Sequence, residues 1–140
     1  MQMKLFVQRL DPRAPLPAYQ TPGSAAMDLA ALLDAPVTIA PRALVNIPTG
    51  LAIALPDAGW VALVFARSGL GIKHGIALSN GVGVIDSDYR GELRVGLTNL
   101  SDTPYTVQPG HPAGASCWSR WACGTSASSA PTRMRRRPPA

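Results

Sequence analysis

Charged side chains and aromatic rings are scarce in this chain of 140 residues. Charged residues make up 15% and aromatic residues 6%, and there are only two cysteines. No apolar run is long enough to span a bilayer, and the N-terminus lacks the apolar core of a signal peptide. We therefore expect no membrane association and, by default, a cytoplasmic location. Cys117 and Cys123 have no second pair beside them, which makes a structural metal site there a poor hypothesis.

Acidic residues are absent from the last thirty positions, and this explains the net charge of +5. Residues 1–110 are neutral, with eight basic and eight acidic side chains, whereas 111–140 carry five arginines. The high isoelectric point therefore describes the tail alone. We divide the chain into a domain at 1–110 and an atypical basic tail at 111–140. We expect the tail to be disordered or the product of a frameshift. Nucleic-acid binding is not expected except through its arginines.

Proline and glycine are abundant instead, with 14 and 13 residues, and they divide the chain into short segments. Such punctuation predicts an all-β sandwich, barrel or jelly roll with little helix. We predict strands at 4–10, 37–40, 60–65, 93–100 and 105–107, and two more within 43–55. The strand at 60–65 should be buried. Helix is expected only near 66–73, and 24–33 is ambiguous because its Ala and Leu content favours helix.

The stretch 78–93 (LSNGVGVIDSDYRGEL) is predicted to be a glycine-rich β-hairpin. Its acidic and aromatic groups, Asp86, Asp88 and Tyr89, lie at one end. Glycines allow a backbone to turn tightly or to approach a flat ligand, beside which a carboxylate could then lie. The alternative is an ordinary hairpin with a solvated polar turn.

The stretch 66–76 (ARSGLGIKHGI) has the chemistry of a phosphate-binding loop. Arg67, Ser68 and free backbone N–H groups can hold a phosphate by charge-assisted hydrogen bonds, although the Walker pattern is absent. The alternative is a polar loop whose arginine pairs with a carboxylate. Asp28 is either a structural acid or part of a magnesium–phosphate site, since Mg²⁺ prefers one or two carboxylates with phosphates and water. His74 is a possible base or a structural residue.

These segments together resemble the trimeric dUTP diphosphatase (dUTPase) family over about residues 4–110. That family has five ordered motifs, and three of them have counterparts here. Residues 26–29 (AMDL) resemble the first motif, 67–69 with 73–76 (RSG, KHGI) resemble the second, and 80–91 resemble the third. The resemblance implies a jelly-roll fold, a homotrimer and Mg²⁺. It also implies hydrolysis of dUTP to dUMP and diphosphate, which supplies dUMP and keeps uracil out of DNA.

The resemblance also implies a role for each site residue. Asp86 is the catalytic residue, which touches the 3′-hydroxyl and orients the attacking water. Tyr89 packs on the deoxyribose and excludes a 2′-hydroxyl. Asn80 and backbone groups of the hairpin read the uracil edge, and Arg67, Ser68 and Gly69 hold the phosphate chain. Val84, Ile85 and Arg94 are further substrate-binding residues. Asp28 supports the Mg²⁺–triphosphate through water. Asp86 and Tyr89 should face one pocket opposite Arg67, in one chain or between symmetric copies.

Two alternatives to this function remain, one from the departures at the end of the chain and one from within the same superfamily. After Gly110 the family's Arg-Ile-Ala-Gln is replaced by His-Pro-Ala-Gly-Ala, and the glycine-rich fifth motif is absent. We therefore expect the last strand of the jelly roll to be lost, and a non-catalytic nucleotide-binding remnant is one alternative. The other is a dCTP deaminase-type relative, although the single glutamate, Glu92, is badly placed for amino-group chemistry.

A frameshift is our hypothesis for the altered end, because out-of-frame GC-rich DNA encodes this mixture of Ala, Arg, Pro, Ser, Trp and Cys. The coding DNA downstream of codon 110 tests the hypothesis. One of its other two frames should encode Arg-Ile-Ala-Gln after Gly110, with one residue between them. If neither frame does so, the hypothesis is wrong.

Overall fold

Short antiparallel strands dominate the structure, a computed structural model that describes residues 5–117, with backbone alone for 113–117. One helix of seven residues interrupts them, which confirms the all-β expectation. The elements are β1 (Phe6–Arg9), β2 (Asp28–Ala30), β3 (Val37–Ile39), β4 (Leu44–Pro48), β5 (Leu51–Ala54), β6 (Ala62–Val64), α1 (Ser68–His74), β7 (Ile76–Leu78), β8 (Gly83–Ile85), β9 (Arg94–Asn99), β10 (Tyr105–Val107) and β11 (Pro112–Cys117).

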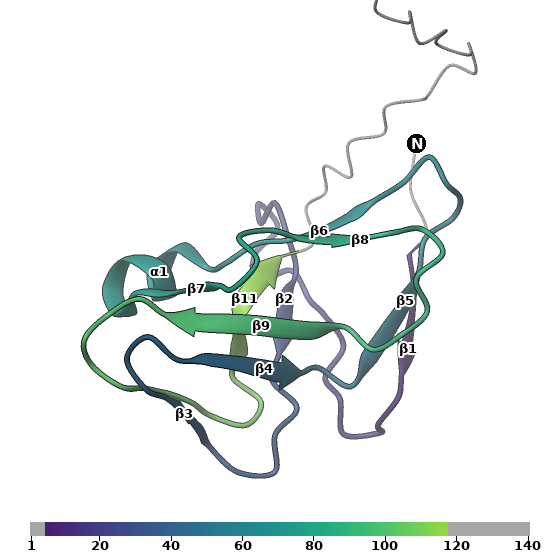
Figure 1. Cartoon of the computed structure of the whole chain (residues 1–140). Helices are drawn as coiled ribbons and strands as arrows, with labels where there is room; N and C mark the ends of the chain where they lie inside the picture. Colours follow the sequence, from purple (N-terminus) through teal and green to yellow (C-terminus); the bar gives the residue numbers. More distant parts are fainter. Residues whose placement is uncertain (1–4, 118–140) are drawn as a thin grey trace, which may run out of the picture.

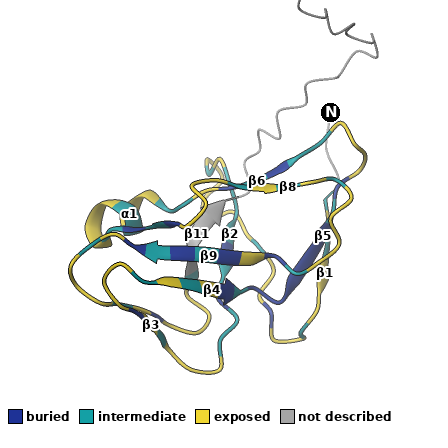
Figure 2. Ribbon diagram, viewed as in Figure 1, coloured by how far each residue is buried: buried dark blue, intermediate teal, exposed yellow. Residues whose placement is uncertain are grey.

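The strands pair as five small sheets around one core. A three-stranded sheet in the order β4-β9-β7 crosses the middle of the molecule, and β6-β8 runs along one side of it (Figure 1). The pairs β1-β5, β3-β10 and β2-β11 complete the set. Buried residues concentrate on β5 and β9 (Figure 2), and six large side chains are almost fully enclosed: Leu29, Ile39, Ile47, Leu51, Ile76 and Leu97.

The ambiguous segment 24–33 forms a strand, β2, and not a helix. Leu29 and Ala31 are each 1% exposed, whereas Asp28 and Ala30, which alternate with them, are only half-buried. This alternation suits a strand with one face on the core. Tertiary burial has therefore overridden the helix propensity of Ala and Leu. The strand predicted at 60–65 shows the same alternation, since Ala62 and Val64 are buried but Phe65 is 38% exposed.

The hairpin predicted at 78–93 is wrong. β7 pairs with β9, and β8 pairs with β6, so the stretch passes from one sheet to another. Gly81, with φ +74°, turns the chain between the two. Gly83 then lies opposite Val64 in the β6-β8 register, where a Cβ would come within 3.0 Å of the Val64 Cβ. The glycines thus permit close packing between strands rather than a tight hairpin turn.

The expected loss of the last strand is also wrong. β11 pairs with β2, with a shift of register between Pro112 and Cys117. Two backbone hydrogen bonds of Ala31 precede this pairing, one with Gly110 and one with His111, and both are 2.9 Å long. The described β structure therefore runs past the predicted boundary at 110. The rest of the predicted tail, from residue 118, lies outside the described residues.

Two buried polar side chains fix loops to the core. Asn99 is 0% exposed and donates from Nδ2 to the carbonyls of Ile39 (3.0 Å) and Thr103 (2.7 Å). Its Oδ1 accepts from the backbone N–H and the hydroxyl of Ser101. Thr49, also 0% exposed, donates to the carbonyl of Leu93 at 2.6 Å. Both side chains have hydrogen-bond partners, as buried polar groups require.

Across residues 5–117, no helix has the length and apolar character needed to cross a membrane.

The corner between β4 and β5 offers a test of this packing. Gly50 has φ +67°, and a Cβ there would lie 2.5 Å from Leu32 Cδ2 and 2.9 Å from Ala14 Cβ. Gly50→Ala should therefore lower the free energy of unfolding by about 1–3 kcal/mol, through strain and overpacking. Urea unfolding followed by tryptophan fluorescence measures the change.

The control is Gly23→Ala, because Gly23 is exposed and a Cβ added there would meet no heavy atom within 4 Å. Its unfolding midpoint should stay close to that of the unchanged chain. Equal midpoints for the two variants would contradict the role of Gly50.

Candidate active site

A cavity of about 210 Å³ lies between β8 and β9. Six of the predicted site residues line it: Asn80, Val84, Ile85, Asp86, Tyr89 and Arg94. Apolar side chains close its inner wall, among them Leu29, Val64 and Leu78. We call it the nucleoside cavity. Asp86 and Tyr89 thus face one cavity, as the sequence predicts.

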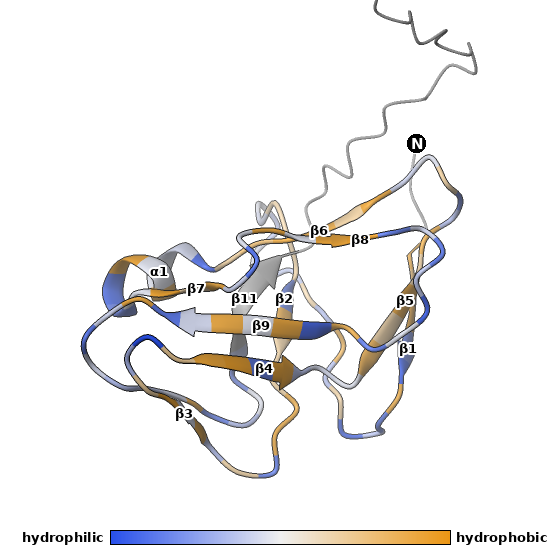
Figure 3. Ribbon diagram, in the orientation of Figure 1, coloured by the Kyte–Doolittle hydropathy of each residue, from blue (hydrophilic) through white to orange (hydrophobic). Residues whose placement is uncertain are grey.

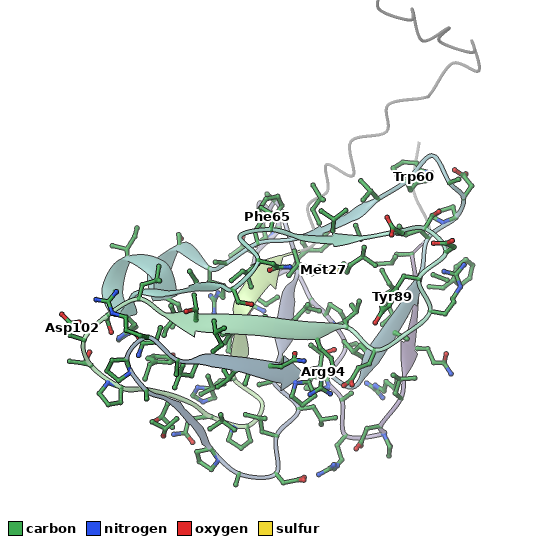
Figure 4. All side chains as sticks on the ribbon, viewed as in Figure 1. Met27, Trp60, Phe65, Tyr89, Arg94 and Asp102 are labelled. Carbon is green, nitrogen blue, oxygen red and sulfur yellow. The ribbon has the colours of Figure 1, made fainter. Side chains whose placement is uncertain are left out.

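The turn from Asp86 to Gly91 is held by its own hydrogen bonds. The Tyr89 N–H donates to the Asp86 carbonyl at 3.1 Å, and the Arg90 guanidinium donates to the carbonyls of Ser87 (2.7 Å) and Tyr89 (2.9 Å). The Tyr89 hydroxyl donates to the Glu92 carbonyl at 2.9 Å. A Cβ on Gly91 would lie 2.5 Å from that hydroxyl, so glycine is needed where the ring folds back. Tyr89 and Arg94 lie at the same end of β9 (Figure 4).

β8 carries an apolar surface that faces solvent in this chain. Val84 is 63% exposed and Val82 is 39% exposed. The strand is largely hydrophobic in Figure 3, and its middle residue is exposed whereas Gly83 and Ile85 are half-buried (Figure 2). Because this strand also lines the nucleoside cavity, a flat apolar ring placed there would cover surface that is now wet.

Arg94 reaches the cavity with its guanidinium already paired. Nη1 lies 2.9 Å from Glu92 Oε2, and Nη2 donates to the Asn46 carbonyl at 3.4 Å. Sequence reasoning missed Glu92, which also lines the cavity. The signal was its spacing, because residues two apart on an extended segment share a face.

A second cavity, of about 600 Å³, lies around the start of α1. It holds the remaining predicted site residues, Asp28, Arg67, Ser68 and Gly69. Lys73 and His74 also line it, with Gln20 and Ser24, which sequence reasoning did not select. We call it the phosphate cavity. It gathers two exposed or half-exposed cations, a hydroxyl and backbone N–H groups, a set suited to phosphate oxygens.

Arg67 and Asp28 form the charged centre of the phosphate cavity. Arg67 Nε lies 3.6 Å from Asp28 Oδ1, and the side chains are 38% and 13% exposed. The alternative reading of this arginine, pairing with a carboxylate, is thus realised in this chain. It does not exclude phosphate binding, because the guanidinium has further donors to offer. The His74 ring lies against the Tyr105 ring, with the centroids 5.0 Å apart and the planes tilted by 45°, which accords with its structural reading.

The two cavities have no lining residue in common. Within one chain, therefore, Arg67 does not face the cavity of Asp86 and Tyr89. The described residues contain no group of three or more His, Cys, Asp or Glu side chains that could hold a metal ion by themselves. Any divalent cation here would depend on a single carboxylate, Asp28, together with ligands from elsewhere.

Comparison with known proteins gives the family. The sequence model of the family described as dUTPase matches residues 12–112. Two relatives named deoxyuridine 5′-triphosphate nucleotidohydrolase, from Aeromonas salmonicida and Shewanella oneidensis, are 54% and 52% identical over 110 residues. Those residues are 79% of this chain and 72% of each relative.

Solved structures agree in fold. A mutant dUTPase from phage phi11 of S. aureus superposes with a TM-score of 0.71 at 21% identity, over 84% of this chain and 92% of that one. The dUTPase of Streptococcus mutans gives 0.68 at 26% identity, over 82% and 94%. The jelly-roll expectation is therefore confirmed. By sequence match, identity and fold together, the chain belongs to the dUTPase family, the hydrolases that cleave dUTP.

Proposed function

We propose that this chain hydrolyses dUTP to dUMP and diphosphate at sites that combine the nucleoside cavity of one copy with the phosphate cavity of another. The observation that carries the proposal is the meeting of Asn80, Asp86 and Tyr89 in one cavity of a dUTPase-family chain. A homotrimer is the assembly that the resemblance implies. A cytoplasmic location stays a prediction.

The nucleoside cavity would select its substrate by shape complementarity to the base and the sugar. Asn80 and the backbone of 83–85 would bind the uracil edge, and the Tyr89 ring would pack on the deoxyribose. Val84 would lose exposed apolar surface to the base. A closed pocket of this kind suits a substrate that differs from its competitors by one methyl, amino or hydroxyl group.

Hydrolysis then needs a positioned water and compensation of charge. Asp86 would accept a proton from the water as its oxygen bonds to the α-phosphorus, and the bond to the bridging oxygen of the diphosphate breaks. Arg67, Ser68 and Gly69 would hold the phosphate oxygens, on which negative charge develops.

Mg²⁺ fits the residues of the phosphate cavity as a substrate-held ion. Asp28 is a single, 13% exposed carboxylate, and no larger ligand group exists among residues 5–117. Such a site suits an ion that keeps its waters and takes phosphate oxygens. The phage phi11 relative is described with a structural Mg(II) ion. When bound, the ion would neutralise phosphate charge, with Asp28 acting through water.

The deaminase alternative is not favoured. Its chemistry needs a glutamate, and both oxygens of Glu92 are already engaged, one by the Gly50 N–H at 2.9 Å and one by Arg94.

A substrate panel tests the function. Diphosphate release should occur with dUTP and be at least about a hundredfold slower with dTTP, dCTP and UTP, because each adds or changes a group at the pocket wall. Ammonia release from dCTP would support the deaminase alternative instead. Binding of dUTP without turnover would support the non-catalytic remnant.

Asp86→Asn tests the catalytic residue. The amide keeps the shape but cannot take the proton, so kcat should fall about 10²–10⁴-fold with little change in KM. The matched control is Asp88→Asn, two residues away in the same turn but not lining either cavity. Steady-state kinetics of both variants decide the matter, and an active Asp86→Asn enzyme would contradict the assignment.

Mixing two inactive variants tests the shared site. Arg67→Ala and Asp86→Asn chains, refolded together in equal amounts, should recover about a quarter of the normal activity, because random assembly pairs intact residues at one site in four. Arg67→Ala mixed with the double variant is the control and should recover none. Failure of the first mixture to exceed the control would place both residues of each site in one chain.

A further inference from the structure

Tyr89 is attached to the core through one peptide group, that between Glu92 and Leu93. The carbonyl of this group accepts the Tyr89 hydroxyl at 2.9 Å. The N–H of the same group donates to the Leu51 carbonyl at 2.7 Å. Leu51 is 0% exposed and Leu93 is 4% exposed, so the inner end of this connection is buried. Any rotation of the peptide group would move the ring.

The carboxylate of Glu92 makes two further contacts that would restrain this peptide group. Oε1 accepts the Gly50 N–H at 2.9 Å, and Oε2 lies 2.9 Å from Arg94 Nη1. The Glu92 side chain is only 25% exposed. Its partner Gly50 is buried in a left-handed conformation, with so little space around it that a Cβ would collide with Leu32 and Ala14. The Gly50 N–H is therefore held in place by the core.

We infer that Glu92 is a positioning residue that holds the Tyr89 ring over the nucleoside cavity and thereby sets discrimination against a 2′-hydroxyl. Its hydrogen bond from the Gly50 N–H fixes the 92–93 peptide, and the peptide fixes the phenol. The inference rests on the proposed function, which gives Tyr89 the sugar. Glu92 itself touches no reacting atom.

Three variants separate this role from general stabilisation. Glu92→Gln keeps an oxygen for the Gly50 N–H, whereas Glu92→Ala removes the side-chain anchor. Tyr89→Phe keeps the ring and removes only the hydroxyl that reaches the 92–93 peptide. The control is Asp102→Asn, which breaks a different ion pair, 3.1 Å from Arg42, and lines neither cavity. Asp102 lies at the opposite end of the molecule from Tyr89 (Figure 4).

The experiment measures binding of dUDP and UDP to the full chain by equilibrium dialysis, so that its result does not depend on turnover. The unchanged chain, Glu92→Gln and Asp102→Asn should prefer dUDP within about threefold of one another. Glu92→Ala and Tyr89→Phe should each lose about tenfold or more of that preference, chiefly by binding UDP better relative to dUDP. A chain that carries both Glu92→Ala and Tyr89→Phe should lose no more preference for dUDP than the more severe of the two single variants, because both changes release the same ring.

Equal weakening of dUDP and UDP in Glu92→Ala would show a merely structural role and overturn the inference, as would a Glu92→Gln loss equal to that of Glu92→Ala. If Glu92→Ala does not fold, the test depends on Tyr89→Phe. An unchanged preference for dUDP in that variant then overturns the inference. If the unchanged chain does not distinguish dUDP from UDP, the sugar assignment of Tyr89 in the proposed function fails first, and the inference falls with it.

Discussion

The corner at Thr49–Leu51 supports the candidate site through a set of mostly buried hydrogen bonds. Thr49 Oγ1 donates to the Leu93 carbonyl and accepts the Leu51 N–H, and the Leu51 carbonyl accepts the Leu93 N–H. Gly50 adds its N–H to Glu92. These bonds join β5 to the residues just before β9, in a place where water is excluded, and there each bond is worth more than on the surface. The start of β9, the Asp86–Gly91 turn and the Tyr89 ring all depend on this junction.

In the proposed function, the two cavities divide the chemistry of one reaction between two parts of the fold. β8 and β9 present apolar walls with Asp86 and Tyr89, whereas the start of α1 presents Arg67, Ser68 and backbone N–H groups. Within this chain, the guanidinium of Arg67 is paired with the carboxylate of Asp28. Under that proposal, nucleoside recognition and phosphate binding depend on different elements of the fold, and a complete site combines the two cavities.

The sequence is sufficient for much of this picture. Proline and glycine content predicted most of the strands and the helix of the described residues, and the family motifs named part of the lining of each cavity. It failed where the outcome depends on long-range pairing. Nothing local in 78–93 indicates that β7 joins β9 while β8 joins β6, because the partner Val64 of Gly83 lies elsewhere in the chain. Leu29 is buried by the fold as a whole, against the helix propensity of its neighbours. Glu92 was overlooked because its importance comes from Gly50, more than forty residues away.

Because the two cavities differ in charge and polarity, we expect ligand binding in them to depend differently on ionic strength. In the nucleoside cavity the charges of Glu92 and Arg94 are matched to each other, and burial of apolar surface such as Val84 responds little to dissolved ions. In the phosphate cavity Arg67 and Lys73 would act on a polyanion in the proposed function, and such an attraction weakens as the Debye length shortens, to about 3 Å at 1 M salt. Under that proposal, a high salt concentration would weaken binding of the triphosphate and leave the selection of base and sugar largely unchanged.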